Sequence, residues 1–128
     1  MFVNIVLVGL GGCFGSISRY LLGSYAQQLS KSIDFPYGTL TVNLLGCFII
    51  GFLAQLAEAR GVFTPQARLL VFVGLLGGFT TFSSFGNETL NLARDGQMWS
   101  ALGNVGANVL LGLLLVWLGR TAAYWIWR

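Results

Sequence analysis

The sequence predicts an all-α membrane protein whose chain forms a single domain with four transmembrane helices. Composition is the first reason: 55% of the 128 residues are hydrophobic and only 9% are charged, whereas soluble domains carry about 25% charged residues. The second reason is that four apolar segments reach the roughly 20 residues that cross a bilayer. A third observation, glycines and hydroxyl residues in the middle of one segment, predicts that the third helix is broken.

The predicted spans cover residues 2–25, 38–57, 67–92 and 100–123. Short connections between them hold most of the remaining charges. Because the connections are short, we expect consecutive helices to pack antiparallel as a compact bundle. A secretion signal is the alternative interpretation of the first span, since LGGC at residues 10–13 loosely resembles a lipoprotein cleavage site. The lack of a Lys or Arg before the apolar run argues against this alternative.

Composition also excludes several classes of function. The sequence has no histidine, and its two cysteines, Cys13 and Cys47, lie in apolar segments. A His/Cys metal site and a Cys–His nucleophile are therefore ruled out. We expect both thiols to be buried as small hydrophobic groups rather than joined in a disulfide. The net charge of +3 forms no basic block, so a nucleic-acid-binding protein is not expected.

Lysine and arginine residues are almost evenly divided between the two sides of the membrane. With four spans, both termini share one side with the second connection, and that side holds Arg60, Arg68, Arg120 and Arg128. The other side holds Lys31 and Arg94, together with Arg19 near its end of the first span. Orientation normally follows a clear Lys/Arg excess. The near balance therefore predicts insertion in both orientations, and hence an antiparallel homodimer about a two-fold axis in the membrane plane.

Small residues recur at a spacing that lets helix backbones approach closely. The pairs are Gly11 and Gly15 in the first span and Gly74 and Gly78 in the third, so these helices are expected to make close contacts. Aromatic residues at the two ends of the fourth span are expected to be interfacial anchors: Trp99 at its start, and Tyr124, Trp125 and Trp127 at its end.

The break is expected in the segment GLLGGFTTFSSFGNE at residues 74–88. Gly77 and Gly78 remove two side chains in succession. Three phenylalanines spaced by three are expected near one face of any helix that they join: Phe79, Phe82 and Phe85. Carbonyl groups freed between residues 77 and 80 would point inward and suit a cation. The partially positive edges of phenyl rings suit an anion instead, so both roles can coexist at one break.

Three further polar side chains lie inside the predicted spans, and each has two interpretations. Arg19 either extends to the interface or draws anions toward a pore mouth. Asn43, which shares a helix face with Thr39 and Gly46, either hydrogen-bonds another helix or donates its N–H groups to a permeating anion. Glu88, which closes the broken segment, either carries protons or forms a hydrogen bond near the helix end.

The fourth span carries Asn104, Asn108 and Gly112 on one face. This face either makes polar contacts between helices or lines a pore. Taken together, the polar groups of the spans are amides, hydroxyls and ring edges. Such groups can replace the hydration shell of a permeating anion, and they carry no fixed full charge that would trap it.

Two motifs, GTLTVNLLG at residues 38–46 and GLLGGFTTFSSF at residues 74–85, resemble the signature motifs of the Fluc/CrcB family of fluoride channels, and GGCFGSISRY at residues 11–20 fits the first helix of that family. The resemblance covers all four spans at matching spacing, and the third-helix motif is highly specific. It implies a fluoride-selective passive channel that exports cytoplasmic fluoride down its electrochemical gradient and relieves fluoride toxicity. It further implies a multi-pass protein of the bacterial plasma (inner) membrane that forms a dual-topology homodimer with two pores.

The resemblance also implies roles for individual residues. The backbone carbonyl groups of Gly77 and Thr80 from each chain would hold a structural Na⁺ ion at the dimer centre. The fluoride pathway would be lined by Asn43, Phe82, Phe85, Ser83, Ser84 and Asn108. Further candidates for this pathway, by their polar character and position, are Arg19, Thr39, Thr81 and Glu88.

Three positions differ from the family pattern. Ser84 stands in place of a threonine and keeps the hydroxyl, whereas Gly86 and Gly112 stand where relatives can carry a serine. The track of hydroxyl groups is therefore expected to be shorter, and conduction to depend more on Asn108 or on water.

Two other classes of protein are the alternatives. A small dual-topology, proton-coupled multidrug or cation exchanger needs a membrane-embedded carboxylate, typically in the first helix. The first span has none, and Glu88 is the only candidate elsewhere. A non-conducting assembly subunit needs neither an asparagine face nor a glycine break. Proton-coupled transport would favour the exchanger, and a lack of ion flux through the purified protein would favour the subunit.

Overall fold

The computed structural model describes residues 1–127, and Arg128, which the charge comparison counted, lies outside the described residues. Residues 1–127 form helices and connecting loops, without a β-strand. Four helical segments are long and apolar enough to cross a membrane: Phe2–Ser30, Tyr37–Arg60, Pro65–Arg94 and Met98–Ile126. These segments confirm the four predicted spans. The first is longer than predicted at its C-terminal end, and the other three are longer at both ends.

The third and fourth segments are each divided into shorter elements. The first two are the continuous helices α1 (Phe2–Ser30) and α2 (Tyr37–Arg60). The third consists of α3 (Pro65–Arg68), the π-helical η1 (Leu69–Leu76), α4 (Gly77–Phe79) and α5 (Phe82–Arg94). The fourth consists of α6 (Met98–Gly106), the π-helical η2 (Ala107–Leu111) and α7 (Gly112–Ile126). Short π-helical stretches inside α-helices are frequent at functional sites.

Capping residues explain where the helices begin and end. Helix α2 ends at Gly61, whose φ of 59° is the left-handed conformation that a C-terminal glycine adopts readily. Helix α3 begins with Pro65 in its first turn, after Thr64 accepts a hydrogen bond from the Ala67 N–H group. The second connection is therefore fixed at both ends by local sequence.

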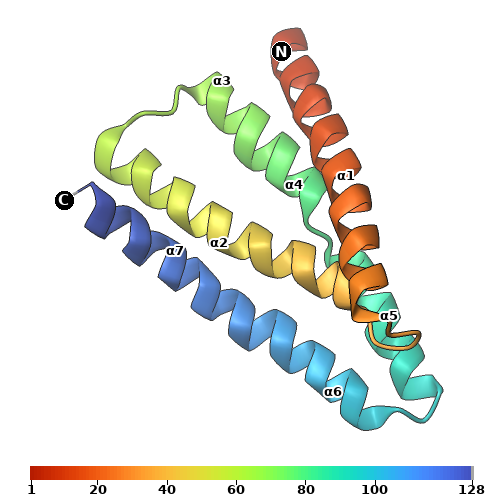
Figure 1. The fold of residues 1–128 in the computed structure, drawn as a ribbon. Helices are drawn as coiled ribbons and strands as arrows, with labels where there is room; N and C mark the ends of the chain where they lie inside the picture. Colours follow the sequence, from red (N-terminus) through yellow and green to blue (C-terminus); the bar gives the residue numbers. More distant parts are fainter. Residues whose placement is uncertain (128) are drawn as a thin grey trace.

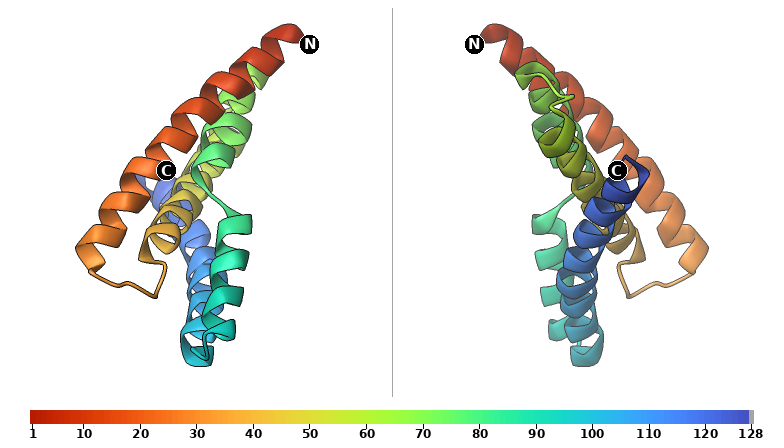
Figure 2. Two further views of the ribbon diagram at one scale, coloured as in Figure 1. Left: turned by 90° about the vertical axis from the view of Figure 1, so that its right-hand side faces the viewer. Right: turned by 90° about the vertical axis from the view of Figure 1, so that its left-hand side faces the viewer.

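The helices pack chiefly as two pairs that are not consecutive in the chain (Figures 1 and 2). Helix α2 lies along α7, and α1 lies along η1 and α4, while α5 packs on α6. The expectation of a compact bundle of consecutive helices is therefore only partly met: α1 contacts α2, but α2 makes few contacts with the third segment. The reason is the break, which lets the two halves of the third segment pack against different helices.

Glycines produce the close contact between the first and third segments, as predicted. A side chain at Gly15 would meet the Leu75 carbonyl oxygen and, at 2.9 Å, the Phe79 nitrogen. A side-chain carbon added at Gly11 would lie 3.0 Å from the Cα atom of Gly74. Since these neighbours are backbone atoms, they cannot move aside as a flexible side chain would.

The break is formed by two extended residues between α4 and α5 (Figure 2). Thr80 has φ −93° and ψ 160°, and Thr81 has φ −150° and ψ 120°. The chain therefore changes direction after Phe79, and the expectation that three phenylalanines share one helix face is wrong. Phe79 is buried in α4 beside Gly46 of α2, whereas Phe82 and Phe85 belong to α5.

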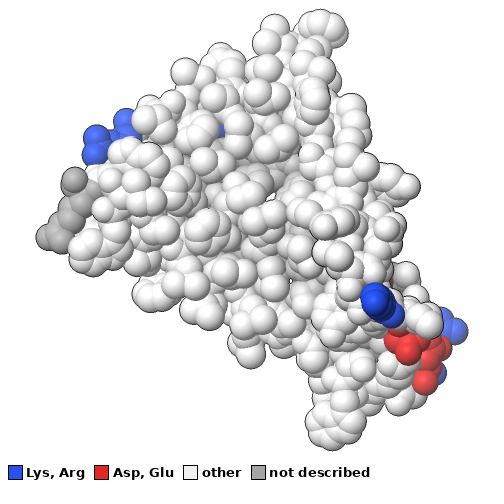
Figure 3. Space-filling view, in the orientation of Figure 1, with Lys and Arg blue, Asp and Glu red and all other residues white. Residues whose placement is uncertain are grey.

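Charged side chains gather at the ends of the molecule, and a wide uncharged surface lies between them (Figure 3). At one end, Arg120 of α7 donates two hydrogen bonds to the Glu58 carboxylate of α2, at 2.8 and 2.9 Å. Cys13 and Cys47 are free thiols, as expected, but Cys13 is exposed at the surface of the chain rather than buried within it.

Candidate functional site

Asn43 of α2 holds the break in place. Its Nδ2 atom donates to the Thr81 carbonyl oxygen at 3.0 Å, and its Oδ1 atom accepts from the Thr81 N–H group at 2.8 Å. A side-chain amide that pairs in this way satisfies both backbone groups of an extended residue inside an apolar segment, where an unsatisfied group would cost several kcal/mol. The broken backbone is thus stable because α2 supplies an asparagine beside it.

The break leaves two carbonyl groups without their usual helical partners. In a continuous helix, the N–H group of Thr81 would donate to Gly77 and that of Ser84 to Thr80, four residues earlier. Here Thr81 donates to Asn43 instead, and Ser84 donates to the Thr81 hydroxyl at 3.2 Å. The Thr80 carbonyl oxygen instead accepts a long hydrogen bond from Arg19 Nη1, at 3.5 Å. Because a carbonyl oxygen has two lone pairs, it keeps capacity for a further ligand, as the Gly77 oxygen does.

A cavity of about 410 Å³ lies beside these groups, and we call it the amide cavity. Its lining contains the amides of Asn43 and Asn108 and the rings of Phe82 and Phe85. The two rings meet edge to face, with centroids 5.4 Å apart and an interplanar angle of 62°. The lining also contains Gly77, Thr80 and Thr81. The structure thus brings together most of the residues that the sequence predicted for the pathway and for the cation.

The two phenylalanines of the amide cavity differ in how the chain covers them. Phe85 is 7% exposed, held among its own helices, whereas Phe82 is 82% exposed. The cavity is therefore walled by the chain on the Phe85 side and open on the Phe82 side.

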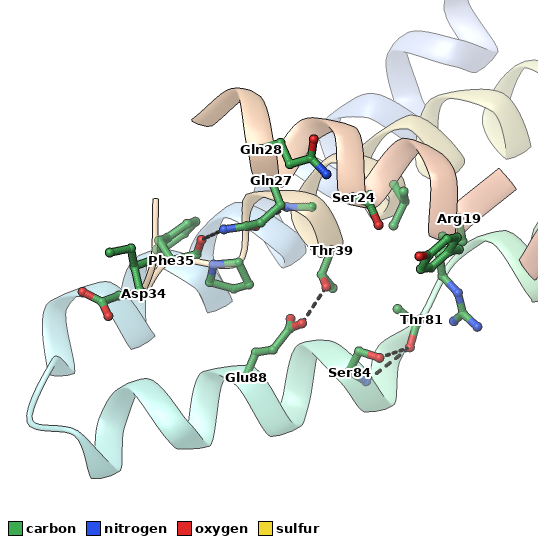
Figure 4. Close-up of a pocket in the computed structure, with 16 residues that line it drawn as sticks. Arg19, Ser24, Gln27, Gln28, Asp34, Phe35, Thr39, Thr81, Ser84 and Glu88 are labelled. Carbon is green, nitrogen blue, oxygen red and sulfur yellow. Dashed lines mark hydrogen bonds between the residues drawn. The ribbon is translucent and has the colours of Figure 1, made fainter. Parts of the chain in front are cut away.

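A second cavity of about 650 Å³ lies on the other side of Thr81, and we call it the vestibule (Figure 4). It is lined by α1, the first connection, the start of α2 and α5. Arg19, Thr39, Ser84 and Glu88 line it, and Thr81 lines both cavities. The guanidinium group of Arg19 lies against the break instead of extending toward the loop end of α1.

Glu88 projects from α5 toward α2 across the vestibule. Thr39 donates from Oγ1 to Glu88 Oε1 at 2.7 Å. The second carboxylate oxygen is buried without a hydrogen-bond partner among the described residues. The hydrogen-bonding interpretation of Glu88 is thus observed, and the open oxygen leaves capacity for one more donor.

Two residues lie differently from what the sequence indicated. Ser83 is exposed and lines neither cavity, and its hydroxyl oxygen is 3.5 Å from that of Thr81. Thr89, which the sequence did not single out, accepts from the buried amide of Asn104 at 2.9 Å. Its position four residues after Phe85 was the available signal, because a threonine hydroxyl commonly bonds the carbonyl group one turn earlier.

The four apolar helical segments define a multi-pass membrane protein, and its two cavities are lined by amides, hydroxyls and aromatic rings. Within residues 1–127, His, Cys, Asp and Glu side chains do not gather in groups of three or more that could hold a metal. Residues 6–120 match the family described as CrcB-like protein, Camphor Resistance (CrcB). The chain belongs to the CrcB family.

Curated relatives share this relationship over nearly their whole length. A protein of Methylobacillus flagellatus is 46% identical over 116 residues, which is 91% of each chain. A protein of Elusimicrobium minutum is 51% identical over 91% of this chain and 90% of its own, and one of Opitutus terrae is 50% identical over 91% and 89%. All three are named "Fluoride-specific ion channel FluC".

Proposed function

We propose that the protein is a fluoride-selective passive channel that exports cytoplasmic fluoride through a bacterial plasma membrane. The observation that carries this proposal is the amide cavity, whose lining combines the amides of Asn43 and Asn108 with the two phenyl rings. The names of the relatives supply the ion, since they are called fluoride-specific channels. Channels of this kind catalyse no reaction, so the protein is not an enzyme.

The chemistry of the lining suits a small anion. Amide N–H groups and ring edges carry partial positive charge, so they replace water around the ion without binding it too tightly to leave. Arg19 adds a full positive charge in the vestibule, beside the break, where it attracts anions before they reach the amides. The route then runs from the vestibule past Thr81 into the amide cavity.

The membrane potential supplies the driving force. One elementary charge moved across a membrane is worth about 2.3 kcal/mol per 100 mV, which corresponds to roughly fifty-fold depletion of an anion from the negative side. Fluoride enters a cell as neutral HF when the outside is acidic and dissociates inside. A passive pore is then sufficient for export.

A second copy of the chain, in the opposite orientation, completes the pore. The Phe82 ring is 82% exposed and Gly77 is exposed, although both line the amide cavity. In a dual-topology homodimer the partner would cover this open side, and two pores would result. The nearly balanced arginines and lysines on the two sides of the membrane support insertion in both orientations.

A structural Na⁺ ion fits the two open carbonyl groups at the break. Gly77 and Thr80 offer hard oxygen ligands of the kind that unwound transmembrane helices use for Na⁺. One chain provides only two such groups, so the site requires the second copy, which contributes the same two. The bound ion would fix the geometry of the break between the chains.

Reconstituted protein provides the test. Liposomes loaded with fluoride should release it when valinomycin and a potassium gradient impose an electrical potential, at a rate that follows the potential. The same release should not depend on an opposing proton gradient. Fluoride movement that required a proton gradient would contradict a passive channel and favour an exchanger.

A further inference from the structure

We propose that Asn104 is a positioning residue that fixes the orientation of the Asn108 amide and, through it, the orientation of the Asn43 amide in the amide cavity. The inference rests on the proposed function, because Asn43 and Asn108 are the amides assigned to the fluoride pathway. Asn104 itself lines neither the vestibule nor the amide cavity. It therefore acts through its neighbours and not by touching the ion.

Asn104 is a buried polar residue whose side-chain hydrogen bonds all go to neighbouring side chains of the fold. It is 1% exposed, the lowest value of any polar residue in the described part of the chain. Its Nδ2 atom donates to Thr89 Oγ1 at 2.9 Å. Its Oδ1 atom and its backbone oxygen each accept from Asn108 Nδ2 at 3.0 Å. Burying an amide is costly unless it is hydrogen-bonded in this way.

Thr89 determines which way the Asn104 amide faces. The Thr89 hydroxyl gives its single proton to the Phe85 carbonyl oxygen at 2.7 Å. The hydroxyl can therefore only accept from Asn104. Asn104 must present its NH₂ group to Thr89 and its oxygen to Asn108.

The orientation of Asn104 in turn fixes the orientation of the two amides that line the amide cavity. Because Asn104 accepts from it, Asn108 turns its own oxygen toward Asn43 and accepts from Asn43 Nδ2 at 2.9 Å. Asn43 then has its oxygen free to accept from the Thr81 N–H group at 2.8 Å. A continuous chain of hydrogen bonds thus links α5, α6, η2, α2 and the break, and its direction is set at the Thr89 end.

This arrangement prepares Asn43 for an anion. Both N–H groups of Asn43 are directed at acceptors, Asn108 Oδ1 and the Thr81 carbonyl oxygen. An arriving fluoride ion, itself only an acceptor, can replace Asn108 Oδ1 without reorienting Asn43. If Asn108 were free to rotate its amide by half a turn, its NH₂ group would meet that of Asn43, donor against donor, and Asn43 would lose the acceptor that holds its amide in this orientation.

The test compares two substitutions at Thr89 in reconstituted protein. Thr89→Val keeps the shape and removes the hydroxyl, so Asn104 loses its acceptor and Asn108 its fixed direction. Fluoride efflux should fall by about fivefold, the factor that corresponds to one net hydrogen bond. Thr89→Ser keeps the hydroxyl and should retain the efflux of the wild-type protein. Asn104→Leu should resemble Thr89→Val, and the double variant should be no slower than Asn104→Leu alone, because both act on one chain of bonds.

Thr121→Val is the matched control. The Thr121 hydroxyl also bonds the carbonyl group four residues earlier, that of Trp117 at 2.9 Å, but Thr121 lies half-buried in α7 and lines neither the vestibule nor the amide cavity. Efflux should be unchanged in this variant. Side-chain amide resonances of Asn43 and Asn108, recorded by ¹⁵N NMR, give a readout independent of transport and should shift in Thr89→Val but not in Thr89→Ser.

The outcomes separate this inference from the proposed function. A wild-type protein that releases no fluoride would overturn the channel itself. A wild-type protein that conducts, with Thr89→Val conducting equally well and leaving the Asn43 resonance in place, would overturn the positioning role alone. Should Asn104→Leu fail to fold, the pair of Thr89 variants still decides the question.

Discussion

The side chain of Asn43 forms two hydrogen bonds with the backbone of a single residue, Thr81, donating at 3.0 Å and accepting at 2.8 Å. This pair of bonds joins the second transmembrane segment to the break in the third. It also draws the Thr81 N–H group away from the Gly77 carbonyl, so one contact both stabilises the break and frees one of the two proposed cation ligands. The predictions below begin from this contact.

Asn43→Ala should reduce fluoride flux strongly while leaving the dimer assembled. The substitution removes the proposed anion donor and leaves the Thr81 backbone groups unsatisfied, at a cost of about 1–3 kcal/mol. Fluoride-electrode measurements on proteoliposomes, with cross-linking to follow the dimer, would check this. Asn87→Ala is the control, because Asn87 is exposed on α5 and lines neither cavity. Equal flux in both variants would remove Asn43 from the pathway.

Phe82→Ile should impair fluoride flux with little change in the stability of the single chain. The Phe82 side chain is 82% exposed, so few contacts within the chain are lost, while the ring edge in the amide cavity disappears. Phe85→Ile, at a buried ring, should additionally lower the unfolding temperature. Flux assays and thermal unfolding in detergent would separate the two effects. Undiminished flux in Phe82→Ile would show that its ring does not face the ion.

Glu88→Gln should raise fluoride flux by about two- to fivefold, which corresponds to roughly 0.5–1 kcal/mol of charge repulsion. A glutamine oxygen can still accept from Thr39, so the substitution removes the negative charge from the vestibule and keeps the hydrogen bond. Asp34→Asn, at an exposed carboxylate of the same cavity, should have a smaller effect. Complete loss of transport in Glu88→Gln would instead identify Glu88 as the carboxylate of an exchanger.

Gly15→Ala should destabilise the fold by about 1–3 kcal/mol or more, the usual cost of overpacking. The added carbon would collide with backbone atoms of Leu75 and Phe79, which have no room to move. Gly9→Ala, in the same helix, is the control, because an added carbon there meets nothing within 4 Å. Similar unfolding temperatures for the two variants would contradict the close contact between α1 and the third segment.

Replacing Na⁺ by a larger cation should weaken fluoride conduction severalfold. A site formed by the Gly77 and Thr80 carbonyl groups of two chains would fit a small ion, and a larger one would push the break apart. Flux measured in solutions that differ only in the cation would check this prediction. Conduction that is indifferent to the cation would argue against the sodium site.

Local pattern was sufficient to predict much of this architecture. Hydropathy located the four spans, and the spacing of Gly11, Gly15, Gly74 and Gly78 predicted the close helix contact. The break was predicted in the correct segment, but Gly77 and Gly78 are themselves helical, and the extended residues are Thr80 and Thr81. These features depend on residues close together in the sequence or on one repeated spacing, so they can be predicted from the amino-acid sequence without knowledge of the fold. The residues around the break were predicted from the resemblance of two motifs to a known family, which local pattern alone does not provide.

Features that depend on pairing between helices could not be predicted. Four uniformly apolar segments do not indicate that α2 packs on α7 and α1 on η1. The face shared by Asn104 and Asn108 was recognised, but its partner Thr89 lies on another element, and only the fold brings them together. The separation of Phe79 from Phe82 follows from the extended conformation of Thr80 and Thr81, which spacing alone does not reveal.

Fluoride efflux from liposomes that contain only the purified protein tests the central claim most directly, with chloride-loaded liposomes as the reference. The account predicts rapid electrical release of fluoride and no measurable release of chloride, because the proposed pathway through the amide cavity would admit only the smaller halide. Equal release of the two ions, or release of neither, would contradict it.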